Sequence, residues 1–503
     1  MNRGAHVAGG RSTVLPPLAL VGVVGLLVAG TAAATAAGLP ALAGARMGRP
    51  VTVIGATAVC PDLRQGGGVT TRVSAGSAAT SSEGSIQTQR LSPSGPRLRR
   101  AAVRPGQVSA GFGGDVSRDG MVVTARGPLA GGLEVEQLTR GDRAADRGFA
   151  GLRCGPPSSE AWFVGGGAAA GERALLVLAN SDDAPALVDV AVFSSTGAQD
   201  PRPGAGLAVA PHSRTFVQLD TLAAGKDLLA VHVRTRRGRL AAALRYTRYD
   251  GQVPGGVEWV PQSQPPATTV VVPGVPVGPG HRYALITNPG PDDTTVSVQV
   301  TTSDGQFLPT GLEAVRVAAG HTVRERLDAL TDTSGLALRV VSSGGPVLAG
   351  GYVLDTSDTG PVSEISYTAG SAPLSGPALL TDVDLDESRQ ETLLLSTLGA
   401  APASVLLRPV AISGSTTRLP GASTVRVPAG RTITVDLVSL IVGATQGRFA
   451  LEVVPAAGSA PVYAVRYLRE SGADGPLTTL LDLQSPAQKV LRPAVVRDPG
   501  AAG

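Results

Sequence analysis

The sequence predicts an all-β protein of tandem immunoglobulin-like antiparallel β-sandwich domains after an N-terminal signal or anchor helix. Three observations predict it. One motif recurs three times, as VAPHSRTFVQLDTL from Val209, VAAGHTVRERLDAL from Val317 and VPAGRTITVDLVSL from Val427. Apolar and polar residues alternate in the stretches around the motif, which is typical of strands that bury one face. The first 45 residues contain a long uncharged stretch.

The N-terminal segment, residues 1–45, indicates export. Arg3 and Arg11 precede a run without charge from Ser12 to Ala45. Its small residues, TAAATAAG, suit cleavage of a secretory signal, whereas the apolar run is also long enough for a helix that spans a membrane. We therefore expect a cleaved signal peptide or an uncleaved anchor. Either one predicts an extracytoplasmic protein, secreted or anchored to the cytoplasmic membrane.

An N-terminal β-rich domain is expected over residues 46–157. It contains both cysteines of the chain, Cys60 and Cys154. Because exported thiols tend to pair in oxidising compartments, we predict a disulfide that joins the first strand of this domain to its last. The alternative is two buried, unpaired thiols. No metal site is expected, since no histidine lies near either cysteine in the sequence.

The repeats predict three β-sandwiches, at residues 158–250, 266–357 and 376–470. At a spacing of 108 residues, ALLVLAN ending at Asn180 aligns with YALITN ending at Asn288. Each copy then has two apolar stretches around a glycine-containing turn, which we interpret as a hairpin, and ends in a tyrosine. Six or seven short strands per copy would be the strand density of a sandwich.

The recurring motif is interpreted as structural. Its leucines recur at an interval of three, which predicts a single helical or 3₁₀ turn at one end of each sandwich. Its apolar positions match between copies while the polar ones differ, as Ser213, His321 and Arg431 illustrate at one aligned position. A ligand-binding loop is the alternative.

The segments between the copies predict linkers. Residues 251–265 and 358–375 are rich in proline and polar residues and are interpreted as semi-rigid spacers, which would allow sandwiches in a line or packed together. Residues 471–503 are expected to form a frayed C-terminal tail.

Several motifs together resemble a known family. They are the export segment, the paired cysteines, GLRCGPPSSEAWFVGGG, and the LANSDD, GGVEWVPQ and LDTL elements. They resemble the actinobacterial secreted proteins of the DUF5719 family, along nearly the whole chain. The resemblance implies an envelope-associated protein of uncharacterised function with no catalytic residues to transfer, and it directs attention to envelope glycosyltransferases as partners.

Composition argues against nucleic acid as a partner. Charged residues make up 16% of the chain, and the net charge of +4 is spread along it. The local exception, GPRLRRAAVRPG, is a solvated loop or a surface contact for acidic polymer or lipid headgroups. Its basic residues are Arg97, Arg99, Arg100 and Arg104.

Common catalytic signatures are not found in the sequence. No hydrolase motif occurs, and the five histidines have no metal-ligand spacing. One acidic stretch, TDVDLDESRQE, fails the calcium-loop pattern because Glu387 and Leu393 occupy its glycine and glutamate positions. We interpret it as an exposed strand, with a loose calcium site as the alternative. Trp162 is expected in a core. For Trp259 we expect either an exposed surface contact or packing over a domain joint.

The sequence thus predicts a non-enzymatic exported protein of the cell envelope, with no catalytic residue, cofactor or metal. We expect a scaffold or an accessory or binding module, linked to surface-polysaccharide assembly. Its partners would be envelope or membrane proteins, a glycosyltransferase among them, or a glycan. The alternative is an exported enzyme or a metal-dependent ligand binder with its site in the N-terminal domain. Convergence of Asp62, Asp115 and Glu134 would favour that alternative.

Overall fold

The computed structural model describes most of the chain after residue 48. The described residues are 49–61, 68–79, 83–92, 98–101, 109–110, 120–142, 146–330, 335–357, 360–384, 389–412, 418–440, 447–472 and 474–492. The predicted export segment, residues 1–45, therefore lies outside them. Two units are distinguished by their internal contacts, one formed by Met1–Val51 with Val490–Gly503 and one by Thr52–Lys489. In the first unit, β1 (Arg49–Thr52) pairs with β37 (Lys489–Arg492).

The second unit contains four two-sheet β-sandwiches, which we call the N sandwich and sandwiches 1, 2 and 3. The N sandwich consists of β2 (Gly55–Cys60), β3 (Val69–Ser77), β4 (Ser85–Leu91), β5 (Leu98–Ala101), β6 (Ser109–Ala110), β7 (Gly120–Arg126), the 3₁₀ turn η1 (Gly127–Gly132), β8 (Leu133–Gly141) and β9 (Gly148–Arg153). Sandwich 1 consists of β10 (Glu160–Val164), β11 (Glu172–Asn180), β12 (Ala186–Ser194), β13 (Gly197–Ala198), η3 (Arg202–Gly204), β14 (Leu207–Val209), β15 (Ser213–Gln218), η4 (Leu219–Thr221), β16 (Ala230–Arg237), β17 (Ala241–Asp250), β18 (Val253–Val260) and β19 (Gln262–Ser263).

Sandwiches 2 and 3 continue the series. Sandwich 2 consists of β20 (Thr269–Val275), β21 (Gly280–Thr287), β22 (Thr294–Thr301), β23 (Gln306–Phe307), β24 (Val315–Val317), β25 (Thr322–Arg326), η5 (Asp328–Leu330), β26 (Leu336–Ser342), β27 (Leu348–Ser357) and β28 (Gly360–Ala369). Sandwich 3 consists of β29 (Ala378–Asp384), β30 (Arg389–Ser396), β31 (Ala403–Val410), β32 (Ser423–Val427), β33 (Thr432–Asp436), α2 (Leu437–Leu440), β34 (Arg448–Pro455), β35 (Tyr463–Gly472) and β36 (Gly475–Asp482).

All four sandwiches share one strand order. When the short extra strands β13, β19 and β23 are set aside and the rest are numbered within each sandwich, one sheet has the order 1-6-3-4 and the other 5-2-7-8, with antiparallel neighbours. The all-β prediction is confirmed. The order differs from that of immunoglobulin domains, where the first strand pairs with the second, so the immunoglobulin-like part of the prediction was wrong. The N-terminal domain was not among the three predicted copies, yet it has the same topology as they do.

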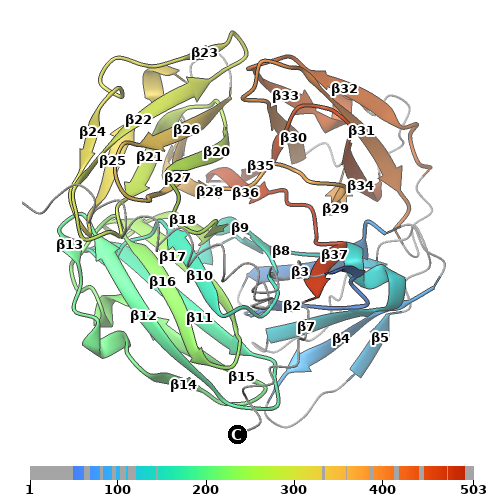
Figure 1. The fold of residues 1–503 in the computed structure, drawn as a ribbon, viewed down its shortest axis with the longest axis horizontal. Helices are drawn as coiled ribbons and strands as arrows, with labels where there is room; N and C mark the ends of the chain where they lie inside the picture. Colours follow the sequence, from blue (N-terminus) through green and yellow to red (C-terminus); the bar gives the residue numbers. More distant parts are fainter. Residues whose placement is uncertain are drawn as a thin grey trace, which may run out of the picture. The chain divides into compact units, whose positions relative to one another are not determined.

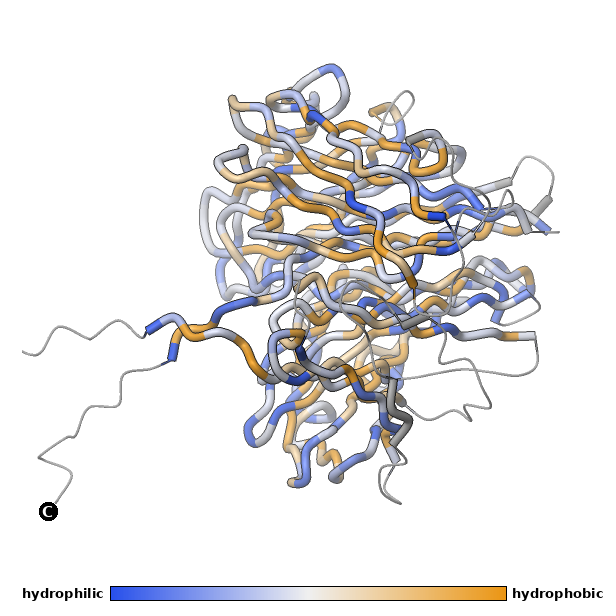
Figure 2. The backbone as a smooth tube through the Cα atoms, turned by 90° about the vertical axis from the view of Figure 1, so that its right-hand side faces the viewer, coloured by the Kyte–Doolittle hydropathy of each residue, from blue (hydrophilic) through white to orange (hydrophobic). Residues whose placement is uncertain are grey.

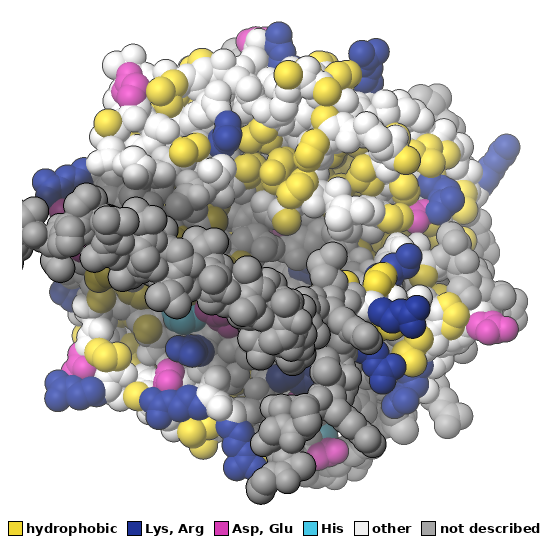
Figure 3. Space-filling model, viewed as in Figure 1, with side chains coloured by type: hydrophobic (Ala, Val, Ile, Leu, Met, Phe, Trp, Pro, Cys, Tyr) yellow, Lys and Arg dark blue, Asp and Glu magenta, His cyan; other side chains and the backbone are white. Residues whose placement is uncertain are grey.

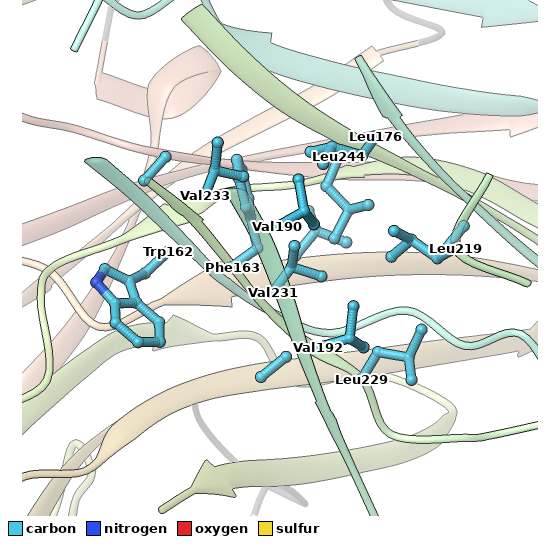
Figure 4. Close-up of a cluster of buried hydrophobic side chains, with 14 of the residues drawn as sticks. Trp162, Phe163, Leu176, Val190, Val192, Leu219, Leu229, Val231, Val233 and Leu244 are labelled. Carbon is cyan, nitrogen blue, oxygen red and sulfur yellow. The ribbon is translucent and has the colours of Figure 1, made fainter. Parts of the chain in front are cut away.

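Alternating burial explains why these segments form sandwiches. In β12, Val188, Val190 and Val192 are buried while the intervening side chains are partly exposed. Figure 2 shows apolar and polar stretches interspersed along the strands. Figure 4 shows Phe163 with Val190 and Val231 in the core of sandwich 1, whereas the neighbouring Trp162 points in a different direction. Period-two patterning thus builds a core between the two sheets of each sandwich.

The recurring motif has the predicted structure. Its leucine segments form η4, η5 and α2, and the first leucine of each segment is fully buried. The aligned asparagines also act alike, because the Asn180 side chain donates to the carbonyls of Ala184 and Val209. Asn288 makes the same bonds one copy later, to Asp292 and Val317.

Two predictions about connections were wrong. The stretches around each glycine turn, such as β16 and β17, belong to different sheets of one sandwich, so the turn crosses between sheets and forms no hairpin. The predicted spacers are also mostly strand, because β18 and β28 lie within them, and β36 lies within the predicted tail. The glycine, proline and acidic residues of these segments are typical of linkers, but the strands that they form are largely buried.

The disulfide prediction is confirmed. Cys60 ends β2 and Cys154 follows β9, and their sulfur atoms are bonded at 1.99 Å. Both residues are buried in the core of the N sandwich. The bond therefore joins the first strand of that sandwich to its last strand.

Replacing both cysteines by serine (C60S/C154S) should lower the stability of the N sandwich. Loss of a cross-link that closes a loop of 94 residues is expected to cost about 4.6 kcal/mol in the chain-entropy model. Urea unfolding followed by circular dichroism would measure it, and dithiothreitol should lower the midpoint of the wild-type chain but leave the variant unchanged. Equal midpoints for both chains without reductant would contradict this role.

Candidate functional site: the junction of the four central strands

The eighth strand of every sandwich lies at a common junction. These strands, β9, β18, β28 and β36, are called the central strands. In cyclic order β18 contacts β28, β28 contacts β36, β36 contacts β9, and β9 contacts β18 (Figure 1). Sandwich 3 therefore packs against the N sandwich, and the series of four closes into a ring.

Apolar clusters cross every joint of this ring. Trp259 of sandwich 1 packs with Ala150 and Leu152 of the N sandwich. The core of sandwich 1 continues into residues of sandwich 2, such as Tyr367, and the core of sandwich 2 continues into Leu480 of sandwich 3. The last joint is closed by a cluster in which residues of the N sandwich meet residues of sandwich 3. Its members are Leu138, Phe149, Leu468, Leu477 and Leu481.

Glycines allow the central strands to approach closely. A Cβ atom on Gly151 of β9 would lie 2.7 Å from Oγ1 of Thr479 on β36. One on Gly256 of β18, where φ is +109°, would overlap the Glu364 carboxyl group. Both positions therefore require glycine, the first for space and the second also for its backbone conformation.

Carboxyl side chains accept backbone N–H groups at the buried sheet edges. Oε1 of Glu258 accepts from the N–H of Gly151 at 2.9 Å, and Oε1 of Glu364 accepts from the N–H of Val257 at 3.2 Å. Asp482 accepts from the N–H of Ala369 at 3.2 Å. An edge strand that is covered by protein has N–H groups that no neighbouring strand satisfies, and these acids supply the acceptors.

The bonds form a cyclic series. Glu258 of sandwich 1 accepts from the N sandwich, Glu364 of sandwich 2 from sandwich 1, and Asp482 of sandwich 3 from sandwich 2. The fourth joint uses Glu136 on β8 of the N sandwich, which accepts from the N–H of Thr381 in sandwich 3 at 3.1 Å. Going around the ring, an acid of each sandwich therefore accepts a hydrogen bond from the sandwich before it, and sandwich 3 comes before the N sandwich.

Burial changes the ionisation of these acids. It raises the pKa of Glu258 and that of Glu364 well above the usual value, despite the hydrogen bonds that both accept. It raises the pKa of Asp482 to about 7, although the Thr368 hydroxyl and the Ala369 N–H lower it. Among the described residues, the second oxygens of Glu258 and Glu364 have no hydrogen-bond partner. Burial therefore favours the protonated form of both glutamic acids.

A buried charge network reinforces the joint between sandwich 3 and the N sandwich. The fully buried guanidinium of Arg466 donates to Glu391 at 2.7 Å and to Glu136 at 3.2 Å. Asp382 lies close by, 1% exposed, in ion pairs with Arg448 and with Arg72 of the N sandwich. The prediction of an exposed strand for the acidic stretch was therefore wrong at Asp382, whose charge is neutralised by arginines. Asp386 and Glu387 lie outside the described residues.

The tyrosine that ends each copy lies at a joint. Tyr352 stacks on Tyr367 with ring centroids 5.0 Å apart, and Tyr246 of sandwich 1 meets the edge of Tyr367. At the next joint, Tyr467 donates to buried Asp355 of sandwich 2 at 3.1 Å. The sequence revealed the repeated tyrosine, and the structure assigns it to contacts between sandwiches.

The turn of the recurring motif also contacts the preceding sandwich. In sandwich 2 it brings His321 beside Ser194 of sandwich 1, where the two backbones form a bridge. In sandwich 3, Arg431 donates to the Ser303 carbonyl of sandwich 2 at 2.7 Å. The polar residues of this turn differ between copies because each copy faces a different neighbour.

Several predicted site residues are placed by the structure. Trp259 is 3% exposed within the joint between sandwich 1 and the N sandwich, so its prediction as an exposed surface contact was wrong and the packing alternative holds. Trp162 is buried and stacks on His232 with centroids 3.7 Å apart. Arg99 and Arg100 lie in β5, whereas Arg97 and Arg104 are outside the described residues.

The proposed convergence of acids in the N-terminal domain stays a prediction. Asp62 and Asp115 lie outside the described residues, and Glu134 is paired with Arg153. Burial raises the pKa of Glu134 to about 7, although Arg153 lowers it. Within the described ranges, no group of three or more histidine, cysteine, aspartate or glutamate residues could hold a metal ion. In the same part of the chain, no helix has both the length and the apolar character needed to cross a membrane.

Comparison with protein families decides the membership of the chain. Residues 108–438 match a family described as a family of unknown function, DUF5719. The chain belongs to the DUF5719 family. The match runs from the N sandwich to α2 of sandwich 3 and so includes three of the four central strands. No curated protein matches this DUF5719 chain significantly.

Replacing Arg466 by methionine (R466M) should destabilise the closed ring. The substitution removes the cation that bonds both Glu391 and Glu136 and, among the described residues, leaves Glu391 only the more distant Arg389, at 3.9 Å. Loss of this buried partner is expected to cost about 3–5 kcal/mol in the free energy of unfolding. Urea unfolding at pH 7 would measure this loss. As a control, R316M removes the exposed pair between Arg316 and Asp293 and should change stability by less than about 1 kcal/mol. Equal effects of the two substitutions would contradict the role of Arg466.

Proposed function

We propose that this chain is a non-enzymatic exported protein of the cell envelope that acts as a rigid scaffold or binding module. The observation that carries the proposal is the closed ring of four sandwiches, in which buried acids and arginines bond neighbouring sandwiches to each other. A large apolar contact at every joint, strengthened by these bonds, opposes the relative motion that separate domains usually have. A body of this kind presents surfaces at constant separations, which suits a scaffold.

Two features support an extracytoplasmic location. The buried disulfide between Cys60 and Cys154 is typical of proteins that fold in an oxidising compartment. The uncharged run from Ser12 to Ala45 has the composition of an export signal or an anchor. Partners would then be membrane or wall proteins, and proteins that assemble surface polysaccharide are the class we propose.

The outward surface offers contact points for such partners. Phe216 on β15 is 47% exposed and Phe307 on β23 is 42% exposed, on different sandwiches. Aromatic side chains are common anchors of protein interfaces. Figure 3 shows that exposed apolar side chains lie among charged ones on one face of the molecule.

Photo-crosslinking in the native host would test the proposal. Benzoylphenylalanine would replace Phe216 or Phe307, and the same residue at the exposed polar position Asp304 would serve as a matched control. Irradiation should link the aromatic positions to a glycosyltransferase or another envelope-assembly protein in the membrane or wall fraction. Recovery of the chain without crosslinks, in the medium and lacking its N-terminal segment, would overturn the scaffold proposal.

A further inference from the structure

The junction contains three acids without a cation bonded to any of them among the described residues. Glu258, Glu364 and Asp482 accept hydrogen bonds from backbone N–H groups, and Asp482 also lies 3.0 Å from the Thr368 hydroxyl. Their side chains are buried, so ionisation would place negative charge where solvent has little access. A retained proton avoids this cost.

The cationic neighbours of the acids bond other groups. Arg147 donates to the carbonyls of Ser363 and Pro476, and Arg153 pairs with Glu134. These two arginines favour ionisation of Glu364 and Asp482 only at longer range. Among the other polar groups of the described residues, Thr479 and Tyr367 interact with Glu258, and the Thr368 hydroxyl bonds to Asp482. Arg248 bonds to the hydroxyl of Ser363, the residue before Glu364.

We propose that the junction is a proton-operated lock, which is closed while Glu258, Glu364 and Asp482 hold protons and loosens between the sandwiches as they ionise. Each of the three acids belongs to a different sandwich and bonds the central strand of the preceding one. When the acids ionise, the repulsion between their carboxylates and the tendency of these carboxylates to become hydrated therefore act at the joints between sandwiches. They do not act within the core of one sandwich. Glu258 and Glu364 also lie near enough to oppose each other's ionisation, since each carboxylate would face a second negative charge.

The direction of the pH effect follows from the proton balance. In the loosened state the acids regain ordinary pKa values near 4 to 4.5, so above about pH 4.5 that state binds fewer protons than the closed one. The closed state is therefore favoured at low pH, and this preference is lost as pH rises through the closed-state pKa values. The closed-state pKa of Asp482 is about 7, and burial also raises the pKa of both glutamates well above the usual value. Each proton released shifts the equilibrium by up to about tenfold per pH unit.

Trp259 is a built-in reporter of the lock. It follows Glu258 on β18 and is buried against the N sandwich, whereas the second tryptophan, Trp162, lies on β10. A W162F chain keeps Trp259 as its sole tryptophan. Its emission maximum and its quenching by acrylamide would be recorded from pH 5 to pH 10, with far-ultraviolet circular dichroism to show that the sandwiches stay folded.

We expect a red shift and a severalfold rise in quenching above about pH 7, with unchanged circular dichroism. The variant E258Q/E364Q/D482N, made in the W162F chain, should lose this transition because its side chains cannot ionise. The control E325Q removes a glutamate on β25 whose pKa burial also raises, but which is far from the central strands in the sheet order, and it should keep the transition.

Hydrogen exchange of the wild-type chain provides a second measurement if the variants fold poorly. Protection of residues 253–260 and 360–369, corrected for intrinsic exchange, should fall between pH 6 and pH 9. Protection of β12, in the sheet without a central strand, should stay constant. Constant Trp259 emission and constant protection across this range would overturn the lock, as would a transition that persists in the triple variant.

Discussion

The free edges of four sheets meet in one buried place, and their N–H groups need acceptors there. This constraint governs the rest of the structure. Neighbouring strands cannot supply the acceptors because the central strands of adjacent sandwiches do not pair with each other in a common sheet. The acids Glu258, Glu364 and Asp482 supply them for three of these strands, and glycines at Gly151 and Gly256 leave room for the approach. The ring of sandwiches follows from this arrangement, since each acid connects one sandwich to the preceding one.

The sequence predicted local structure better than arrangement, for physical reasons. The motif from Val209 keeps its apolar spacing, so its helical turn could be predicted, and the export-like N-terminus made pairing of Cys60 with Cys154 the expected outcome. The central strand of GGVEWVPQ was missed because glycine, proline and a charged residue usually indicate a linker. Here the glycines provide space and Glu258 satisfies backbone groups. A single sequence gives no sign that an acid will be buried by another domain.

The N sandwich was recognised as β-rich but not as a copy of the repeats. It has their strand order, yet its 3₁₀ turn lies between the sixth and seventh strands rather than between the fifth and sixth. The three copies of the motif, which begin at Val209, Val317 and Val427, all lie in sandwiches 1 to 3. Topology can persist where residue identity does not, since many apolar side chains fill a sandwich core equally well. The family match, which begins at residue 108 inside this sandwich, agrees with its place in a common architecture.

The ring closes where the N sandwich meets sandwich 3, and a cross-link between these two sandwiches would test that contact. The hydroxyl groups of Ser74 on β3 and Thr381 on β29 lie 2.5 Å apart across that joint. In a chain with both residues changed to cysteine (S74C/T381C), a disulfide should form within the monomer, so neither new thiol is alkylated after denaturation without reductant. Each single variant should show one reactive thiol. Alkylation of both new thiols in the double variant, or disulfide-linked dimers, would contradict the closed ring.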